Sequence, residues 1–225
     1  MKSAKIAADI SQAAYRKAEI FLSALDHDWA RHIASIGPCL HAAKPAREPY
    51  QALVRAIAYQ QLHVRAGDAI LGRMLALYGD NGESNFPTAR QLLDTDVATL
   101  RGCGFSASKI ATIHGIAQAA LDGVVPLRKE ALAMSDAALI ERLVTLRGVG
   151  QWTVEMLLIY TLERSDILPA DDFGVREGYR RLKNLAQTPT RKQIGEIGLA
   201  WSPYRTVASW YLWRLPKTPA ANEVI

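Results

Sequence analysis

The amino-acid sequence predicts an all-α protein. Apolar residues recur close to the helical period in nearly every long segment, for example at Leu53, Ile57 and Met74. Alternating runs typical of strands, bounded by Asn-Gly or Asp-Gly turns, are absent. Glycine and proline break the apolar pattern at points such as Gly37-Pro38, and these breaks divide the chain into about ten helices of ordinary length.

The expected helices follow one another without a flexible linker. Helical spacing runs first through residues 7–25 and then through residues 53–77. Two further helices are expected at 135–146 and from residue 151 to residue 162, and another at 173–183. No break between them is long or of low complexity, so any two lobes of this chain are expected to pack together.

Size and composition place the chain among folded proteins. Its 225 residues, 49% apolar and 22% charged, fit one domain or two small lobes that share a core. Two cysteines, Cys39 and Cys103, cannot build a disulfide framework or supply the four thiolates of an iron–sulfur cluster. This cysteine content is typical of a protein from a reducing compartment. The first twenty residues lack the apolar run of a signal peptide, and no run of eighteen apolar residues occurs, so neither secretion nor a membrane-spanning segment is expected.

The positive charge is concentrated in the last quarter of the chain. Residues 173–225 contain nine Lys or Arg and three Glu, a balance of +6. The whole chain carries +5, so the first 172 residues carry −1. A basic segment on a nearly neutral body indicates a polyanionic partner such as nucleic acid. Solvated surface charge that keeps the protein soluble explains the same numbers.

The segment from Ser135 to Leu162 predicts two helices joined by a very short glycine turn. Ser135 is a good N-cap, and the first helix stops at Gly148-Val149-Gly150, where Val149 can pack back into the core. The second helix begins at about residue 151, and its unpaired N–H groups and positive dipole end can bind a phosphate without reading base sequence. A plain pair of helices with a tight turn is the alternative interpretation.

The string LRGVGQWTVEML in this segment resembles the helix-hairpin-helix of the DNA glycosylase superfamily, which pairs this hairpin with a downstream Gly/Pro-rich loop and an aspartate. Here LPADDF begins 18 residues after the last hairpin glycine. Within the superfamily the chain is similar to the compact 3-methyladenine DNA glycosylases. The resemblance implies two helical lobes with a cleft between them. One lobe would span about 49–165 and include the hairpin at 135–162, and the other would combine about 1–48 with 173–225. Further blocks that carry the resemblance are PYQALVRAIAYQQLH, GCGFS and the segment from Trp201 to Trp213.

An aspartate after the hairpin suits hydrolysis of an N-glycosidic bond. Positive charge builds on the sugar as the base leaves, so a fixed carboxylate stabilises the transition state more than the ground state, and the carboxylate can also orient or deprotonate the attacking water. The chemistry alone does not choose between Asp171 and Asp172, and both could merely cap a helix. The resemblance implies that Asp172 is catalytic and leaves Asp171 as the N-cap or the support of the loop. A helix N-terminus favours the charged form of a carboxylate, so Asp172 is not expected to protonate the leaving base.

The residue two positions after the last hairpin glycine separates two reaction types within the family. Members that also cut the DNA backbone have a lysine there, which forms a Schiff base with the sugar. This chain has Trp152. The resemblance therefore implies a monofunctional hydrolase that leaves an abasic site, with Trp152, Phe173 and Trp213 as walls of the base pocket. Met156 stands where larger relatives have a tyrosine and could alter the range of adducts. Core packing is the alternative role for each tryptophan.

The resemblance also implies how DNA is held. A side chain from the turn after residue 59 fills the gap left by the flipped base, with Gln61 first and Leu62 and His63 as alternatives, whereas Gln60 is expected to bond within the fold. The expected contacts with the DNA backbone come from Gly148, Gly150, Thr153, Ser106 and Lys109.

No metal bound by side chains and no cofactor is expected, although related hairpins bind Na⁺ or K⁺ through main-chain carbonyls, here those of Leu146 and Val149. The expected partner is duplex DNA containing alkylated bases, with no membrane, and the chain is expected to be a monomer, in the bacterial cytoplasm (nucleoid) or the eukaryotic nucleus. The resemblance therefore implies a DNA glycosylase that excises 3-methyladenine and 7-methylguanine. A non-catalytic protein that binds DNA through the hairpin, or a glycosylase for other lesions, is the alternative.

Overall fold

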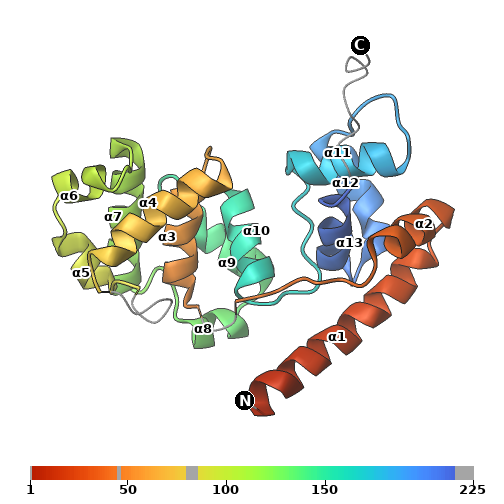
Figure 1. Ribbon diagram of the computed structural model, residues 1–225, viewed down its shortest axis with the longest axis horizontal. Coiled ribbons are helices and arrows are strands. Elements are labelled where there is room, and N and C mark those ends of the chain that lie inside the picture. The colour runs from red at the N-terminus through yellow and green to blue at the C-terminus, as the bar shows by residue number, and fades with distance from the viewer. Residues whose placement is uncertain (1, 45–46, 80–85, 216–225) are drawn as a thin grey trace. The chain divides into compact units, whose positions relative to one another are not determined.

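The computed structural model of the chain describes residues 2–44, 47–79 and 86–215. These residues form thirteen α-helices and a short 3-10 helix and contain no strand (Figure 1). The contacts divide the chain into two compact units: unit 1 comprises Met1–Ala42 and Arg164–Ile225, and unit 2 comprises Ala43–Glu163. The all-α class predicted from the sequence is confirmed. None of the described helices is long and apolar enough to cross a membrane.

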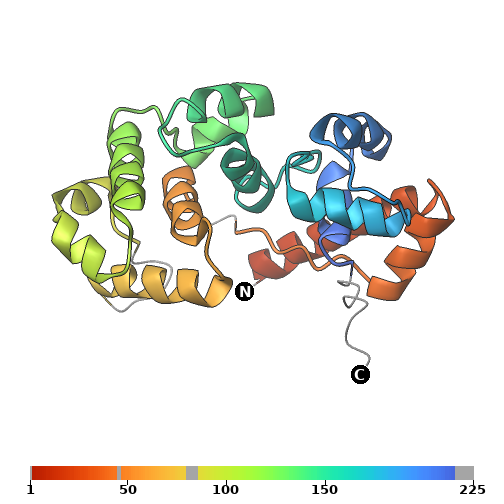
Figure 2. The same cartoon turned by 90° about the horizontal axis from the view of Figure 1, so that it is seen from above.

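Unit 2 is built around α3, which lies between α7 and α10 (Figure 2). Helices α4 and α5 pack on α3 and α7 respectively, and α9 packs on α10. The centre of the unit is filled by the fully buried side chains of Leu53, Ile57, Ile113, Ile116 and Leu158. The helices of unit 2 are α3 (Pro49–Tyr59), α4 (Val64–Ala76), α5 (Ala89–Asp94), α6 (Val97–Gly102), α7 (Ala107–Leu121), α8 (Arg128–Ala133), α9 (Asp136–Leu143) and α10 (Gln151–Tyr160).

Polar side chains define where several of these helices begin. Thr88, Asp96, Ser106 and Ser135 each accept a hydrogen bond from a main-chain N–H three residues later, which satisfies one of the unpaired donors of the first turn. Three of the helices, α5, α6 and α8, have only six residues. The expected number of about ten helices is therefore too low, because such short helices show too little of the apolar period to be counted from the sequence.

Unit 1 packs its helices around α13, whose residues from 206 to 212 are all buried. Helices α1, α2 and α11 all contact α13. Trp29, Trp201 and Tyr211 are the largest fully buried side chains, and the indoles of Trp29 and Trp201 meet edge to face at 5.5 Å. The helices of unit 1 are α1 (Lys2–Ser23), α2 (His27–Ile36), α11 (Phe173–Leu182), α12 (Arg191–Ile197), η2 (Gly198–Trp201) and α13 (Arg205–Leu212).

Candidate functional site

The loop that leads from α10 to α11 is anchored at its start to the N-terminus of α13, within unit 1. The Asp166 carboxylate accepts hydrogen bonds from Nε and Nη2 of Arg205, at 2.7 and 2.9 Å, and from Oγ of Ser202 at 2.8 Å. The Thr206 hydroxyl donates to the carbonyl oxygen of Arg164 at 2.7 Å. Burial is the largest single effect on the pKa of Asp166 and raises it, but the hydrogen bonds from Arg205 and Ser202 and the charge of Arg205 together bring the pKa below its usual value. A charged, bidentate pair therefore fixes the loop that carries the two candidate aspartates.

Asp172 is the N-cap of α11. Its Oδ1 accepts a hydrogen bond from the main-chain N–H of Val175 at 2.9 Å and another from Nε1 of Trp213, also at 2.9 Å. Asp171 is exposed. Of the two roles expected for Asp171, that of N-cap is wrong, because Phe173 is the first helical residue and Asp172, directly before it, is the cap. Support of the loop by Asp171 stays a prediction. Asp172 thus combines the capping position with a side-chain donor from α13.

Gly174 allows the indole of Trp213 to approach this carboxylate. A Cβ atom on residue 174 would lie 2.9 Å from Cδ1 of Trp213 and 3.0 Å from Oδ1 of Asp172. Any other residue at position 174 would have to displace the indole or the carboxylate. The first turn of α11 therefore needs a glycine because Trp213 packs against it, and the neighbouring sequence gives no sign of this contact.

The two predicted pocket residues of unit 1 differ in exposure. Trp213 is partly buried and holds Asp172, so its described role is to orient the carboxylate. The phenyl ring of Phe173 is 67% exposed. A base-stacking role for either ring stays a prediction.

The hairpin between α9 and α10 lies in unit 2, and its second helix begins where predicted, but its first helix is shorter than predicted, because α9 ends at Leu143 and not at residue 146. Ser135 caps α9, α10 begins at Gln151, and Val149 is buried at the turn. Gly148 has φ +81°, and a Cβ atom there would lie 2.4 Å from Oγ1 of Thr112 on α7. The N-cap of α10 is a glycine with no side-chain cap, so this helix N-terminus can accept a phosphate oxygen.

Gln60 links the hairpin to the end of α3. Its Nε2 donates to the carbonyl oxygen of Gly148 at 3.3 Å and to Oγ1 of Thr153 at 3.4 Å. The internal role expected of Gln60 is confirmed. Thr153 is buried, so its described role is to support the turn from inside. The next residue, Gln61, has φ +57°, and it is exposed together with Leu62 and His63.

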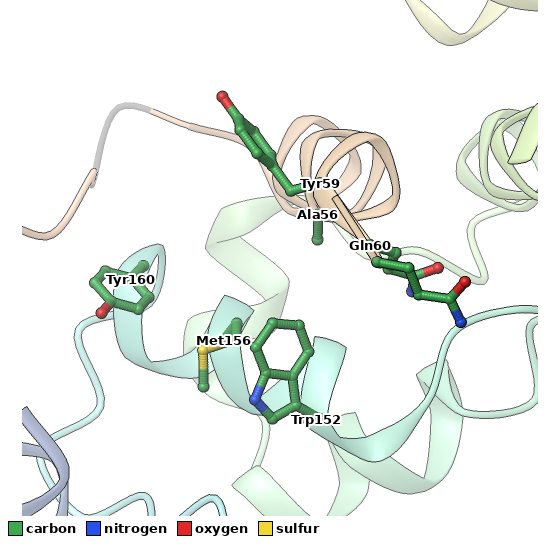
Figure 3. Close-up of a pocket in the computed structure, with 7 residues that line it drawn as sticks. Ala56, Tyr59, Gln60, Trp152, Met156 and Tyr160 are labelled. Carbon is green, nitrogen blue, oxygen red and sulfur yellow. The ribbon is translucent and has the colours of Figure 1, made fainter. Parts of the chain in front are cut away.

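A hollow of about 640 Å³ opens beside this turn and is mostly apolar. Trp152 and Met156, both predicted to line a base pocket, lie along α10, and Ala56 of α3 points into the space between the two helices (Figure 3). The structure therefore brings Trp152 and Met156 together with the turn that holds the expected wedge. The full lining consists of Ala56, Tyr59, Gln60, Gln61, Trp152, Met156 and Tyr160.

Sequence reasoning missed the two tyrosines of this hollow. Tyr160 is at the third position of the series 152, 156, 160, a four-residue spacing that places all three side chains along one face of α10. That spacing could have found it. Tyr59 is held by contacts that no spacing reveals: its hydroxyl donates to Oδ1 of Asp68 at 2.5 Å, and its ring covers Gly67, where a Cβ atom would lie 2.3 Å from the ring. Burial and the Asp68 hydrogen bond raise the pKa of Tyr59, so the phenol stays protonated.

Comparison with known proteins places this geometry in a family. The family model described as HhH-GPD superfamily base excision DNA repair protein matches residues 54–203, a range that includes the hairpin and Asp172. The chain belongs to the HhH-GPD superfamily. It is 44% identical over 202 residues to DNA-3-methyladenine glycosylase 1 of Schizosaccharomyces pombe, and this alignment covers 89% of this chain and 87% of that protein. It is 39% identical to the Alkylbase DNA glycosidase-like protein mag2 of the same yeast, over 90% of this chain and 94% of that protein.

Solved structures of HhH-GPD relatives have the same fold. S. pombe 3-methyladenine DNA glycosylase (Mag1) in complex with abasic DNA is 42% identical and has a TM-score of 0.79, over 88% of this chain and 95% of that chain. DNA-3-methyladenine glycosidase from Bacillus halodurans is 32% identical with a TM-score of 0.75, over 87% of each chain. The superfamily resemblance predicted from the sequence is therefore confirmed.

Other residues of this HhH-GPD protein that are expected to contact DNA or a cation form hydrogen bonds within the fold. Ser106 caps α7 by accepting a hydrogen bond from the main-chain N–H of Lys109, and the Lys109 ammonium donates to main-chain carbonyls of unit 2. The carbonyl oxygen of Leu146 accepts the N–H of Val149. A monovalent cation at the carbonyls of Leu146 and Val149 stays a prediction. In the described part of the chain, no group of three or more His, Cys, Asp or Glu could hold a metal ion.

Proposed function

We propose that this chain is a monofunctional DNA glycosylase that hydrolyses the N-glycosidic bond of alkylated bases, 3-methyladenine and 7-methylguanine, in duplex DNA. It would leave an abasic site for base excision repair. The observation that carries the proposal is the Asp172 carboxylate, held at the start of α11 by two N–H donors, in a chain 44% identical to an S. pombe 3-methyladenine glycosylase.

Asp172 acts on the sugar. As the bond to the base breaks, positive charge develops on the deoxyribose, and a carboxylate already fixed in place stabilises that charge without reorganising. The hydrogen bonds from Val175 and Trp213 to Oδ1 supply this fixation. A 3-methyladenine base is cationic before it leaves, so no acid is required to protonate it. The same carboxylate can orient the attacking water.

The hairpin and the adjacent turn of unit 2 hold the DNA. The N-terminus of α10, capped only by Gly150, takes a backbone phosphate, and Gln61 enters the space that the flipped nucleotide leaves. The hollow beside Trp152 and Met156 receives the base. Stacking of a cationic purine on an indole contributes about 0.5–2 kcal/mol, so we infer that binding selects modestly and that the weakened bond of the damaged nucleotide contributes the rest of the selectivity.

No strand cleavage by Schiff-base chemistry is proposed. The position that carries a lysine in the lyases of this fold is Trp152, and an indole cannot form an imine with the sugar. The product is therefore expected to be an intact strand with an abasic site, which breaks only after treatment with hot alkali.

Single-turnover base release from a methylated duplex tests the proposal with Asp172→Asn. The amide keeps an oxygen that can accept from Val175 and Trp213 but removes the charge, so excision should fall by at least about 100-fold while affinity for a duplex with a stable abasic analogue is retained. Asp171→Asn is the matched control, because Asp171 is the exposed neighbour and should excise normally.

Two results would contradict the proposal. Full activity of Asp172→Asn would remove the assigned mechanism. Tight, salt-sensitive DNA binding by the unmodified protein without release of any base from a panel of defined alkylated duplexes would instead indicate a non-catalytic DNA-binding protein.

A further inference from the structure

Lys109 points to the end of α3. Its Nζ donates to the carbonyl oxygen of Ala58 at 2.9 Å and to that of Gln60 at 2.8 Å. These are among the last carbonyls of the helix, which have no partner within the helix itself. The ammonium comes from α7, about fifty residues further along the chain, so it ties two helices together at this point.

The carbonyl of Gln60 belongs to the peptide that joins Gln60 to Gln61. Because a peptide is planar, a hydrogen bond to its oxygen fixes the plane and with it ψ of Gln60 and φ of Gln61. Gln61 has φ +57°, a conformation that residues with a side chain rarely adopt. A cation on the preceding carbonyl is therefore placed where it can hold that conformation.

The side chain of Gln60 is fixed as well. The side-chain amide of Gln60 donates a hydrogen bond to the carbonyl oxygen of Gly148 in the hairpin turn. The main-chain carbonyl oxygen of Gln60 accepts a hydrogen bond from Lys109. The residue before Gln61 is thus held from two sides, by α7 and by the hairpin. Burial lowers the pKa of Lys109, which agrees with an ammonium that has exchanged water for carbonyl partners.

The geometry points to Lys109 as a positioning residue that holds Gln61 in the conformation for entry into the DNA stack, and not as a contact to a DNA phosphate. This inference rests on the proposed function and refines it. A hollow of about 230 Å³ lies next to the turn and is bordered by Gln61, Leu62 and Lys109, which leaves room for the turn to change conformation if the ammonium is removed.

Lys109→Met separates the two roles, because methionine keeps much of the aliphatic stem and loses the ammonium. If Lys109 neutralises a phosphate, the slope of log K against log salt for duplex binding should become shallower by about 0.9. If Lys109 positions Gln61, that slope should not change, and single-turnover excision should fall about tenfold or more. Lys129→Met, an exposed lysine on α8 of the same unit, is the matched control and should behave as the unmodified protein.

A double-mutant cycle with Gln61→Ala shows whether Lys109 acts through Gln61. The loss caused by Lys109→Met should largely disappear in the Gln61→Ala background. Lys109→Arg, which retains N–H donors for the same two carbonyls, should recover most of the activity. Equal losses from Lys109→Met in both backgrounds, or a shallower salt slope, would overturn the inference.

A readout that does not need catalysis keeps this test apart from the proposed function. The fluorescence of 2-aminopurine placed next to a stable abasic analogue rises when a side chain enters the stack. Lys109→Met should reduce this rise at saturating protein, whereas Lys109→Arg should not. If Lys109→Met melts below the assay temperature, Lys109→Gln replaces it in the experiment. Glutamine keeps an N–H donor but on a shorter stem, so the fluorescence rise should be reduced by the same amount. A full fluorescence rise in a folded Lys109 variant without an ammonium or guanidinium would also overturn the inference.

Discussion

Gly174→Ala should separate catalysis from stability at the first turn of α11. The new methyl carbon would lie 2.9 Å from Cδ1 of Trp213 and 3.0 Å from Oδ1 of Asp172. Carbon atoms pack at about 3.5–4.0 Å, so the indole must retreat by roughly half an ångström or more. The 2.9 Å hydrogen bond from Trp213 to Asp172 then opens. A hydrogen bond to a charged group contributes about 1.5–3 kcal/mol. If that much is lost from the transition state, excision falls by about 10- to 100-fold.

The fold should tolerate the same change. Alanine is favoured over glycine in a helix by about 1 kcal/mol, and once the indole has retreated the remaining cost is the opened hydrogen bond, about 1.5–3 kcal/mol, so the free energy of unfolding should fall by no more than about 2 kcal/mol. Thermal unfolding measures this, and single-turnover release of 3-methyladenine measures the rate. Gly195→Ala is the control, because a Cβ atom at Gly195 of α12 meets nothing within 4 Å. An unchanged excision rate for Gly174→Ala would refute the argument that the contact of Trp213 positions the carboxylate.

Two further changes test features outside the carboxylate itself. Glu177 accepts hydrogen bonds from Arg180, Thr188 and Arg181, and with the Arg180 bond as the largest cause its pKa falls from 4.5 to about 2. Its contribution is therefore present above pH 4.5 and is lost as the pH falls toward 2. Glu177→Gln should cost about 1–2 kcal/mol at pH 7, a value already reduced for screening near the surface, and urea unfolding of both proteins should converge at about pH 2. Gly148→Ala should lower the free energy of unfolding by about 2–5 kcal/mol, because φ is +81° and Thr112 is in the way, and Thr112→Ala added to it should recover the steric part in a thermal melt. If the free energies of unfolding of Glu177→Gln and the unmodified protein differ by the same amount at every pH, the first account is contradicted. If Gly148→Ala leaves the melting temperature unchanged, the second is contradicted.

The parts of the fold that could be predicted are those set by local chemistry. The hairpin could be predicted because two glycines indicate a boundary near residues 148–150, and α10 begins there, whereas α9 ends earlier, at Leu143. The choice between Asp171 and Asp172 follows from the start of α11: the helix expected at 173–183 does begin at Phe173, so Asp172 is the residue directly before it. The contact of Gly174 with Trp213, 39 residues away in sequence, could not be predicted, because no local pattern indicates it.

The site residues divide in the same way. The spacing of Trp152, Met156 and Tyr160 follows from the helical period alone and marks one wall of the hollow. The contact of Lys109 with the carbonyl oxygens of Ala58 and Gln60 could not be predicted, because only the folded chain brings these residues together. Sequence reasoning therefore identifies which residues carry chemistry, while long-range contacts decide which of them hold the others in place.

The attachment of the loop at residues 164–172 has a practical consequence for chimeric enzymes. Its first half is tied to Arg205 and its last residue to Trp213, which are the first residue and the C-cap of α13. Exchange of residues 164–213 as one cassette between relatives would transplant the carboxylate together with its ion pair and its indole donor. A graft of the loop alone would separate Asp166 and Asp172 from the helix that orients them, and should yield folded but slow hybrids.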